Sequence, residues 1–554
     1  MDQTVKTFRI NRKELLFLGL IYIFSLFWRL WPRLLIDPHF LTMNADIWER
    51  LAMAQYFFDY GHLPKYCLRY IAYGNVPFWY PPLGPIGLAV LAKISSLDLP
   101  TVCSRIMPFI EALTPISLYF LGRWLFGRAT AYISAFVLAL TPSFIYWTGI
   151  ATPTSFTVFL MPIYIILLLI RNERVSLGYA RLSWIAVLSA ILAVNFLTHL
   201  TYFLAIAILI PIALLIFIKS ASAGKKILDF FVAILISQFI TAFWWARHNL
   251  YSWWLFKLTT SSGYKDPVGQ LNDYGIIAGW IGIIAAAIYL WKILGEPRRY
   301  SRYDWIPLAW IIIPFIETQN EAMLSIINCT YLSWYTLFKP LEGFRFYCFL
   351  AQPLALITGW VIAKFLIQKI RFKKLAGFMT IAVLGLTLCA DLVYLYKIKP
   401  RLQKSRLAAG EYRAMEWFRK NSAKNDRIIA DYYFSQMFAG VCGGKALLGG
   451  LFPLKNVNLP YVSYPAVVQE DICTIYTTFD PKIASDLMRK YRSNCIFISP
   501  LLISNGNISS NKCRGFGIKV EEKKFKHQGY FREIYNNQGV RIIKINTDSP
   551  QVTK

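Results

Sequence analysis

Residues Leu200–Ile218 read LTYFLAIAILIPIALLIFI, a stretch without a single charged side chain. A membrane-spanning helix needs about 20 predominantly apolar residues, so this stretch is long enough to cross a bilayer. The whole chain has the same character, because 56% of its 554 residues are hydrophobic and 16% are charged. Soluble domains carry about 25% charged residues. This composition excludes disorder, a collagen-like fibre and a small disulfide scaffold, and it indicates a membrane protein.

Hydropathy predicts a polytopic α-helical membrane protein with about 11–13 transmembrane helices. The first predicted span follows four basic residues and has no cleavage site of small residues behind it, so we expect a retained helix and not a removed signal peptide. The spans that can be placed lie near 14–32, 105–123, 130–147, 153–170, 182–198, 200–218, 227–246, 274–292, 305–317, 346–363 and 376–396.

Loops rich in Lys and Arg alternate with longer loops that are poor in them. Because cytoplasmic loops carry the basic excess, we expect a multi-pass protein of the cell membrane with its N-terminus in the cytoplasm. The first outer loop is then 33–104, and everything after residue 397 lies outside. The net charge of +29 fits contact with anionic lipid, and we expect no nucleic-acid partner. The basic loops lie at 123–128, 171–181, 219–226, 292–302 and 364–374.

The tail changes character, so we expect two domains, 1–396 in the membrane and 397–554 outside. Short apolar runs alternate with helical patterns in the tail, which predicts an extracytoplasmic α/β domain. Its Cys442, Cys473, Cys495 and Cys513 would form two disulfides in any of three pairings, or stay four buried thiols. The predicted strands are 427–430, 495–499 and 540–545, and the predicted helices are 406–421 and 480–491.

The first outer loop holds the most informative residues. Apolar residues recur at helical spacing after Asn44, which predicts an amphipathic interfacial helix with Asp46 and Glu49 in its first turns. Two acidic residues at this place have two explanations. Either they only complement the helix dipole, or they serve catalysis. The loop ends in Tyr80-Pro-Pro-Leu-Gly-Pro85, which leads into a short apolar helix at 86–97.

This order of motifs resembles the GT-C superfamily of polytopic glycosyltransferases. Asp46 stands where that family has its first-loop acidic residue. Arg105 and the segment 119–127 are similar to its second span, and Phe344-Arg345-Phe346 is similar to the late span whose arginine faces the lipid phosphate. The resemblance implies a GT-C-like fold over most of 14–396 and a lipid-linked sugar donor.

Within that superfamily the chain is similar to archaeal and bacterial single-subunit oligosaccharyltransferases. Residues 412–421 and 426–430 and the glycine pair before Lys445 look like the entry to their outer domain. Their acceptor motif W-W-D-x-G is replaced by Tyr432-Tyr-Phe-Ser-Gln436, and their second acidic motif by the carboxylate-free segment 148–155. The metal site of those enzymes needs several oxygen ligands, and the missing acidic motif removes half of them. These departures from the family pattern favour a monosaccharide transferase over an oligosaccharyltransferase.

We therefore expect an enzyme that moves a sugar from a polyprenyl (dolichyl-type) phosphate to a glycan, lipid or protein acceptor at the extracytoplasmic face. Asp46 is the candidate base, because an acceptor hydroxyl needs a carboxylate within hydrogen-bond reach, and Glu49 would assist it. Arg345 is the candidate for the donor phosphate, since Arg offers two parallel N–H donors, although it would also serve as an interfacial anchor. The resemblance also implies a divalent cation, Mg or Mn, at Asp46, but the second acidic motif that would complete its ligands is missing.

Four more residues are candidate substrate contacts. Tyr80 belongs to the loop-end turn, and Glu111 lies inside a span, with Arg105 almost two turns away as its candidate partner. His199 falls at an outer turn, and Glu317 begins an outer loop. Ionisable groups inside spans are expensive and often functional, whereas a lone His is more often structural. The alternatives for the whole chain are an oligosaccharyltransferase with a degenerate acceptor motif, a non-catalytic scaffold of the same fold, and a secondary transporter. Matched Gly- or Pro-broken halves, typical of transporters, are not found.

Overall fold

The computed structural model describes residues 10–35, 45–64, 80–142, 144–145, 153–173, 178–199, 201–220, 222–256, 276–318, 347–367, 385, 389, 409–423, 425–430, 432–442, 465–500 and 520–546. The chain forms two compact units, Met1–Pro38 with Ser104–Lys404, and His39–Cys103 with Ser405–Lys554. We call them the helical unit and the sheet unit. The expected division after residue 396 concerns the membrane boundary and stays a prediction.

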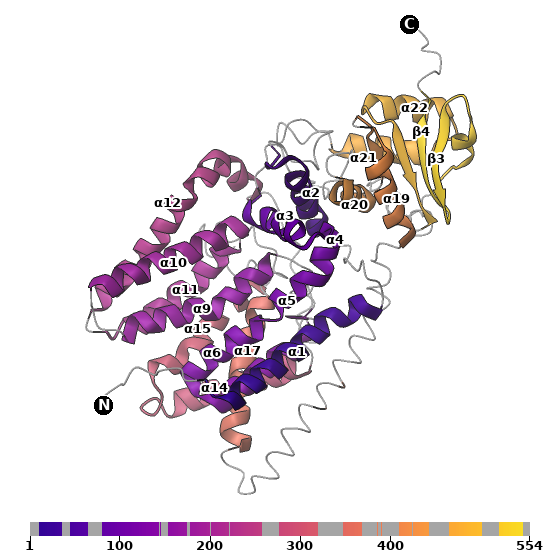
Figure 1. Ribbon diagram of the computed structural model, residues 1–554. Coiled ribbons are helices and arrows are strands. Elements are labelled where there is room, and N and C mark those ends of the chain that lie inside the picture. Colours follow the sequence, from indigo (N-terminus) through magenta and orange to yellow (C-terminus); the bar gives the residue numbers. More distant parts are fainter. Residues whose placement is uncertain are drawn as a thin grey trace, which may run out of the picture. The chain divides into compact units, whose positions relative to one another are not determined.

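The helical unit contains helix at every predicted span up to 346–363, while 376–396 lies almost wholly outside the described residues (Figure 1). Its helices are α1 (Arg12–Leu35), α5 (Met107–Glu111), α6 (Thr114–Phe126), α7 (Arg128–Leu140), α9 (Thr154–Glu173), α10 (Gly178–Thr198), α11 (Tyr202–Phe217), α12 (Ala223–Phe256), α14 (Gly282–Gly295), α15 (Ile306–Thr318) and α17 (Tyr347–Val361). Shorter helical turns are η3 (Ile276–Ile281), η4 (Arg302–Trp305) and η7 (Ile362–Ile367), and η2 (Val102–Ile106) precedes α5.

Three helices in the described part of the chain are long and apolar enough to cross a membrane. They are Thr154–Glu173, Ala180–Thr198 and Ala223–Trp244, and a fourth span results if Leu83–Ser95 and Leu99–Phe126 count as one broken helix. Apolar side chains such as Phe239, 82% exposed, and Phe243, 67% exposed, cover the outside of α12. Contiguous apolar surface of this kind is unfavourable in water and suits lipid. The predicted count of eleven or more spans and their orientation stay predictions.

Basic residues of two predicted loops pair with buried carboxylates within the helical unit. Asp229 of α12 is fully buried and pairs with Arg171 of α9 and Arg181 of α10, each with an N···O distance of 2.6 Å. At the start of α1, Glu14 pairs with Arg123 at 2.5 Å. A buried charge is tolerated when it is paired and hydrogen-bonded, so these contacts fix the ends of the helices to one another.

A glycine allows two helices of the helical unit to approach closely. A Cβ added to Gly359 of α17 would lie 2.2 Å from the Ser134 hydroxyl of α7, 2.8 Å from the Ser134 backbone nitrogen and 2.9 Å from the Thr130 carbonyl. Small residues at helix interfaces permit such backbone contact in membrane bundles, where packing replaces the hydrophobic effect as the attraction. The α7–α17 contact is therefore specified by residue size.

The sheet unit joins the first outer loop to the tail. Its helices are α2 (Ala45–Tyr60), α3 (Leu83–Ser95), α4 (Leu99–Thr101), α19 (Ala409–Asn421), α20 (Tyr432–Cys442), α21 (Pro465–Thr477) and α22 (Pro481–Lys490), with a short turn at η8 (Lys523–Lys526). Its strands are β1 (Ile428–Ile429), β2 (Cys495–Ile498), β3 (Phe531–Asn537) and β4 (Val540–Ile545).

The four strands form one sheet in the order β1-β2-β4-β3, with β1 and β2 parallel and the other pairs antiparallel (Figure 1). Strands β3 and β4 form a hairpin whose turn residues Gln538 and Gly539 have φ of 53° and 79°, as a two-residue turn of this twist requires. The expected α/β tail is thus present. Both expectations for the cysteines, two disulfides or four buried thiols, are wrong, because Cys473 is disulfide-bonded, whereas Cys442 and Cys495 are buried and form no disulfide.

Candidate functional site

Helix α2 carries the predicted catalytic positions, and its burial explains how it is held. Ile47, Trp48, Leu51 and Ala54 are all at most 2% exposed, and the helix packs against α3 and α20 within the sheet unit. The expected amphipathic pattern is therefore present, with the apolar stripe buried in protein. Residues 46 and 49 lie in the first two turns of α2, and their side chains lie outside the described residues.

The contact between α2 and α20 depends on Gly440. A Cβ at this position would lie 2.7 Å from the Trp48 ring, 3.2 Å from the Trp48 carbonyl and 3.3 Å from Leu51 Cβ. The Trp48 ring is almost completely buried, so it has no room to move aside.

We expect Gly440→Ala to destabilise the sheet unit by about 1–3 kcal/mol, the usual cost of forcing extra volume into a packed core. Hydrogen exchange of the peptide covering 45–60 measures this effect, because α2 must then open more often. The matched control is Gly529→Ala, where the nearest atom lies 3.4 Å from the added Cβ. Equal protection of α2 in both variants would contradict the proposed role of Gly440.

Arg50 is a buried charged residue of α2. It is 4% exposed, its Nε donates to the Tyr80 hydroxyl at 2.8 Å, and its guanidinium carbon lies 5.2 Å from the centre of the Tyr80 ring. Among the described residues its Nη1 has no hydrogen-bond acceptor. The pair fixes α2 against the Tyr-Pro-Pro turn and places a positive charge one helical turn after position 46.

Tyr80 is thus a neighbour of Arg50, and Tyr80 is 9% exposed. The sequence contains a signal for the burial of Arg50. Position 50 shares the helical face of Ile47, Leu51 and Ala54, so a charged residue there has to be buried. Buried arginines require partners, and the aromatic turn at residue 80 supplies one.

Glu111 lies in the helical unit at the end of α5 and is 3% exposed. Its Oε1 accepts a hydrogen bond of 3.3 Å from the Ser155 hydroxyl at the start of α9. The expected partner Arg105 is exposed and forms no ion pair with Glu111, so that pairing is wrong. Glu111 therefore belongs to a polar contact between α5 and α9.

His199 follows α10 in a buried network of polar groups. Its Nδ1 accepts from the Thr201 backbone N–H at 3.1 Å and lies 2.8 Å from the Thr201 hydroxyl. That hydroxyl lies 2.7 Å from the Thr157 hydroxyl, which in turn donates to Asn195 at 2.7 Å. Because Nδ1 is an acceptor here, the neutral ring carries its proton on Nε2. The network joins the ends of α9, α10 and α11.

The remaining predicted residues lie outside what the structure describes. Arg345 falls between α15 and α17, and the side chain of Glu317, near the end of α15, is not described either. Among the described residues no group of three or more His, Cys, Asp or Glu side chains is placed to hold a metal. Metal binding through Asp46 stays a prediction.

No protein-family model matches the chain, and no curated protein matches its sequence. Solved structures do match. The archaeal oligosaccharyltransferase AglB from Archaeoglobus fulgidus, in complex with an inhibitory peptide and a dolichol-phosphate, aligns with a TM-score of 0.57 and 12% identity over 88% of this chain and 69% of that one. ArnT from Cupriavidus metallidurans, bound to undecaprenyl phosphate, aligns with a TM-score of 0.56 and 11% identity over 97% and 99% of the two chains.

Both proteins are GT-C glycosyltransferases. The chain has the GT-C fold. The fold that the resemblance implied is thereby confirmed, and the apolar helices together with this fold indicate a membrane protein. At such low identity the GT-C fold does not by itself assign an activity, because one fold supports several.

Proposed function

We propose that this GT-C protein is a glycosyltransferase that moves a sugar from a polyprenyl phosphate to a hydroxyl acceptor at the extracytoplasmic membrane face. The observation that carries the proposal is the construction of α2. An acidic residue at position 46 stands at the start of a helix that is immobilised by α20 and by the Arg50–Tyr80 pair. Rigid support of this kind is what a catalytic group needs to hold its geometry.

In the proposed reaction Asp46 accepts the proton of the acceptor hydroxyl as its oxygen bonds to the anomeric carbon of the donor sugar. The bond between that carbon and the phosphate oxygen breaks, and the oxygen keeps the electron pair. Arg345 stabilises the charge that develops on the phosphate, since a guanidinium donates two parallel hydrogen bonds to such a group. Glu49 assists Asp46, and Tyr80, Glu111, His199 and Glu317 are candidate contacts for the sugar or acceptor.

The kind of donor is supported by the two neighbours with the same fold. One of them was solved with a dolichol-phosphate and the other with undecaprenyl phosphate. The basic loops imply an orientation in which α2 lies on the side opposite the cytoplasm. Nucleotide sugars are cytoplasmic, so the sugar donor on that side would be attached to a lipid. The same orientation puts the sheet unit outside the cell membrane.

Lipid binding tests the proposal directly. The purified protein in detergent is titrated with dolichyl phosphate, undecaprenyl phosphate and phosphatidic acid, and each complex is counted by native mass spectrometry. We expect a polyprenyl phosphate to bind in preference to phosphatidic acid, which carries the same headgroup on different chains. Arg345→Gln should weaken that binding about tenfold or more, and Arg299→Gln, an exposed arginine paired with Glu296, should leave it unchanged. Equal binding of all three lipids would exclude a polyprenyl-phosphate donor.

An oligosaccharyltransferase activity is the second candidate, because AglB shares the fold to the same degree as ArnT. Incubation with a dolichol-linked oligosaccharide and an Asn-x-Thr peptide separates the two. A glycopeptide product would favour the second candidate. Transfer of a single sugar to a non-peptide hydroxyl, with the peptide untouched, would favour the first.

A further inference from the structure

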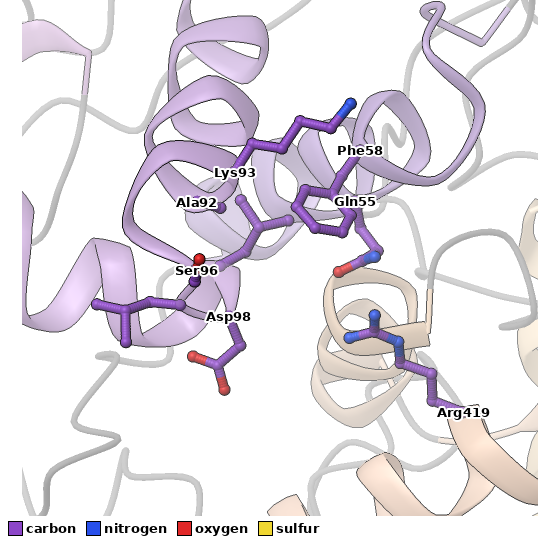
Figure 2. A pocket seen from close by; sticks show the side chains of 9 residues that line it. Gln55, Phe58, Ala92, Lys93, Ser96, Asp98 and Arg419 are labelled. Carbon is purple, nitrogen blue, oxygen red and sulfur yellow. The ribbon is translucent and has the colours of Figure 1, made fainter.

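A pocket of about 360 Å³ opens within the sheet unit, between α2, α3, the turn after α3, and α19 (Figure 2). Its size is at the lower end of the range for small-molecule sites, and it suits a ligand of one or two rings. The side chains that could recognise a ligand come from all four elements. They are Gln55, Phe58, Lys93, Ser96, Asp98 and Arg419.

The pocket carries a surplus of positive charge. Lys93 and Arg419 are exposed, and within the described residues neither has an ion-pair or hydrogen-bond partner. Figure 2 shows the Arg419 guanidinium reaching from α19 toward the side on which Gln55 lies. Two unpaired cations flanking one hollow favour an anionic ligand, and Arg suits a carboxylate because it binds both oxygens.

Asp98 provides the one acidic group of this set and is held in place. Its Oδ1 accepts from the Thr101 backbone N–H at 2.8 Å, and its Oδ2 accepts from the Tyr412 hydroxyl at 2.7 Å. Burial, together with this hydrogen bond to Asp98, raises the pKa of Tyr412, so its hydroxyl remains a donor. An ionised carboxylate only accepts hydrogen bonds, so Asp98 is suited to face ligand hydroxyls.

The other walls suit a hydroxylated ring. Phe58 contributes a half-buried aromatic ring, and Ser96, which adopts a left-handed backbone with φ of 55°, contributes a hydroxyl. Gln55 is 2% exposed, and its Nε2 donates to Asp59 at 2.7 Å. This bond fixes the amide and leaves its oxygen as an acceptor. An apolar face with a few fixed donors and acceptors is the usual construction of a specific small-ligand site.

We propose that this pocket binds an acidic sugar, a mono- or disaccharide bearing a carboxylate, with Arg419 and Lys93 on the carboxylate, Phe58 against the ring and Asp98 on its hydroxyls. A bare phosphate or a lipid headgroup would leave the aromatic wall unused. The inference rests on the proposed function for its role, since the sugar would belong to the donor or the acceptor. It adds a class of sugar to that function.

Binding without turnover tests the inference separately from the transfer activity. Cellobiouronic acid and cellobiose differ only in a carboxylate against a hydroxymethyl group, and each is titrated into the purified full-length protein in detergent by calorimetry. We expect the acidic disaccharide to bind about tenfold more tightly or better. The double variant Lys93→Gln/Arg419→Gln should lose this difference, and Phe58→Leu should weaken both sugars alike.

The control is Lys420→Gln, which removes the same charge from the neighbouring position of α19, where the side chain is exposed. It should keep the preference for the acidic disaccharide. Lack of binding of either sugar at millimolar concentration would overturn the inference. So would equal binding of inorganic phosphate with no effect of Phe58→Leu, because the pocket would then be an ion site. A protein that binds the acidic disaccharide but transfers no sugar would contradict only the proposed function.

Discussion

Replacing Asp46 with Asn should lower sugar transfer by about 10²–10⁴-fold, the contribution expected of a general base. Asn has the same shape as Asp and cannot take up a proton, so the acceptor hydroxyl would attack without assistance. The rate of polyprenyl phosphate release from the reconstituted enzyme measures the loss. Helix α2 should remain in place, because Gly440 allows its close packing against α20 and the Arg50–Tyr80 pair holds it.

The matched control is Asp486→Asn on α22, an exposed carboxylate of the same unit, which should transfer sugar at the wild-type rate. The polyprenyl phosphate affinity of the Asp46 variant should stay near the wild-type value, since a base acts on the acceptor. If the Asp46 variant retained activity within a few-fold of the wild type, Asp46 would not be the base. If it lost lipid binding as well, its role would be in donor binding.

Replacing Asp229 with Ala should destabilise the helical unit by about 3–5 kcal/mol, the usual cost of leaving a buried charge without its partner. Asp229 is fully buried and is the shared partner of Arg171 and Arg181, which hold the ends of α9 and α10 against α12. Its removal leaves two guanidinium groups facing each other. Thermal unfolding of the protein in detergent, followed by the fluorescence of a thiol-reactive dye, measures the loss.

Glu296→Ala serves as the control, because Glu296 is 39% exposed and its bonds to Lys292 and Arg299 lie at the surface. Exposed ion pairs contribute about 0–1 kcal/mol, so its unfolding temperature should hardly change. The triple change of Asp229, Arg171 and Arg181 to Leu should recover much of the stability, since apolar replacements remove the desolvation cost of all three charges. Similar unfolding temperatures for Asp229→Ala and Glu296→Ala would show that the cluster contributes little.

Most elements of the fold can be predicted from hydropathy and from apolar runs of strand length. Helices appear at the predicted spans from α1 to α17, and the tail contains β1, β2 and β4 where apolar runs of strand length indicated them. Strand β3 was missed because its sequence, Phe531–Asn537, is largely polar and forms an edge whose outer face meets solvent. Helix α20 was not predicted, because residues 432–436 were interpreted as the counterpart of an acceptor motif and not by their helical periodicity.

The sequence predicts where the acidic residues of the candidate site lie on the helix, but it does not predict which side chains contact that helix. A carboxylate at the start of an interfacial helix can be read from local spacing, which is how Asp46 and Glu49 were selected. The pairing of Arg50 with Tyr80 spans thirty residues of chain, and the close approach of Gly440 to Trp48 spans far more. Contacts between segments so distant in sequence depend on the tertiary fold, and hydropathy within a window contains no information about them.

The sheet unit is assembled from two stretches of chain separated by Ser104–Lys404 of the helical unit. During synthesis α2 leaves the ribosome long before α20, the helix against which its tryptophan packs. Until α20 follows, the part of the apolar stripe of α2 that α20 buries is uncovered and would rest on lipid, which its amphipathic pattern allows. On the proposed function, position 46 would gain its fixed setting only after the tail is made, so a partly made chain would be inserted but inactive.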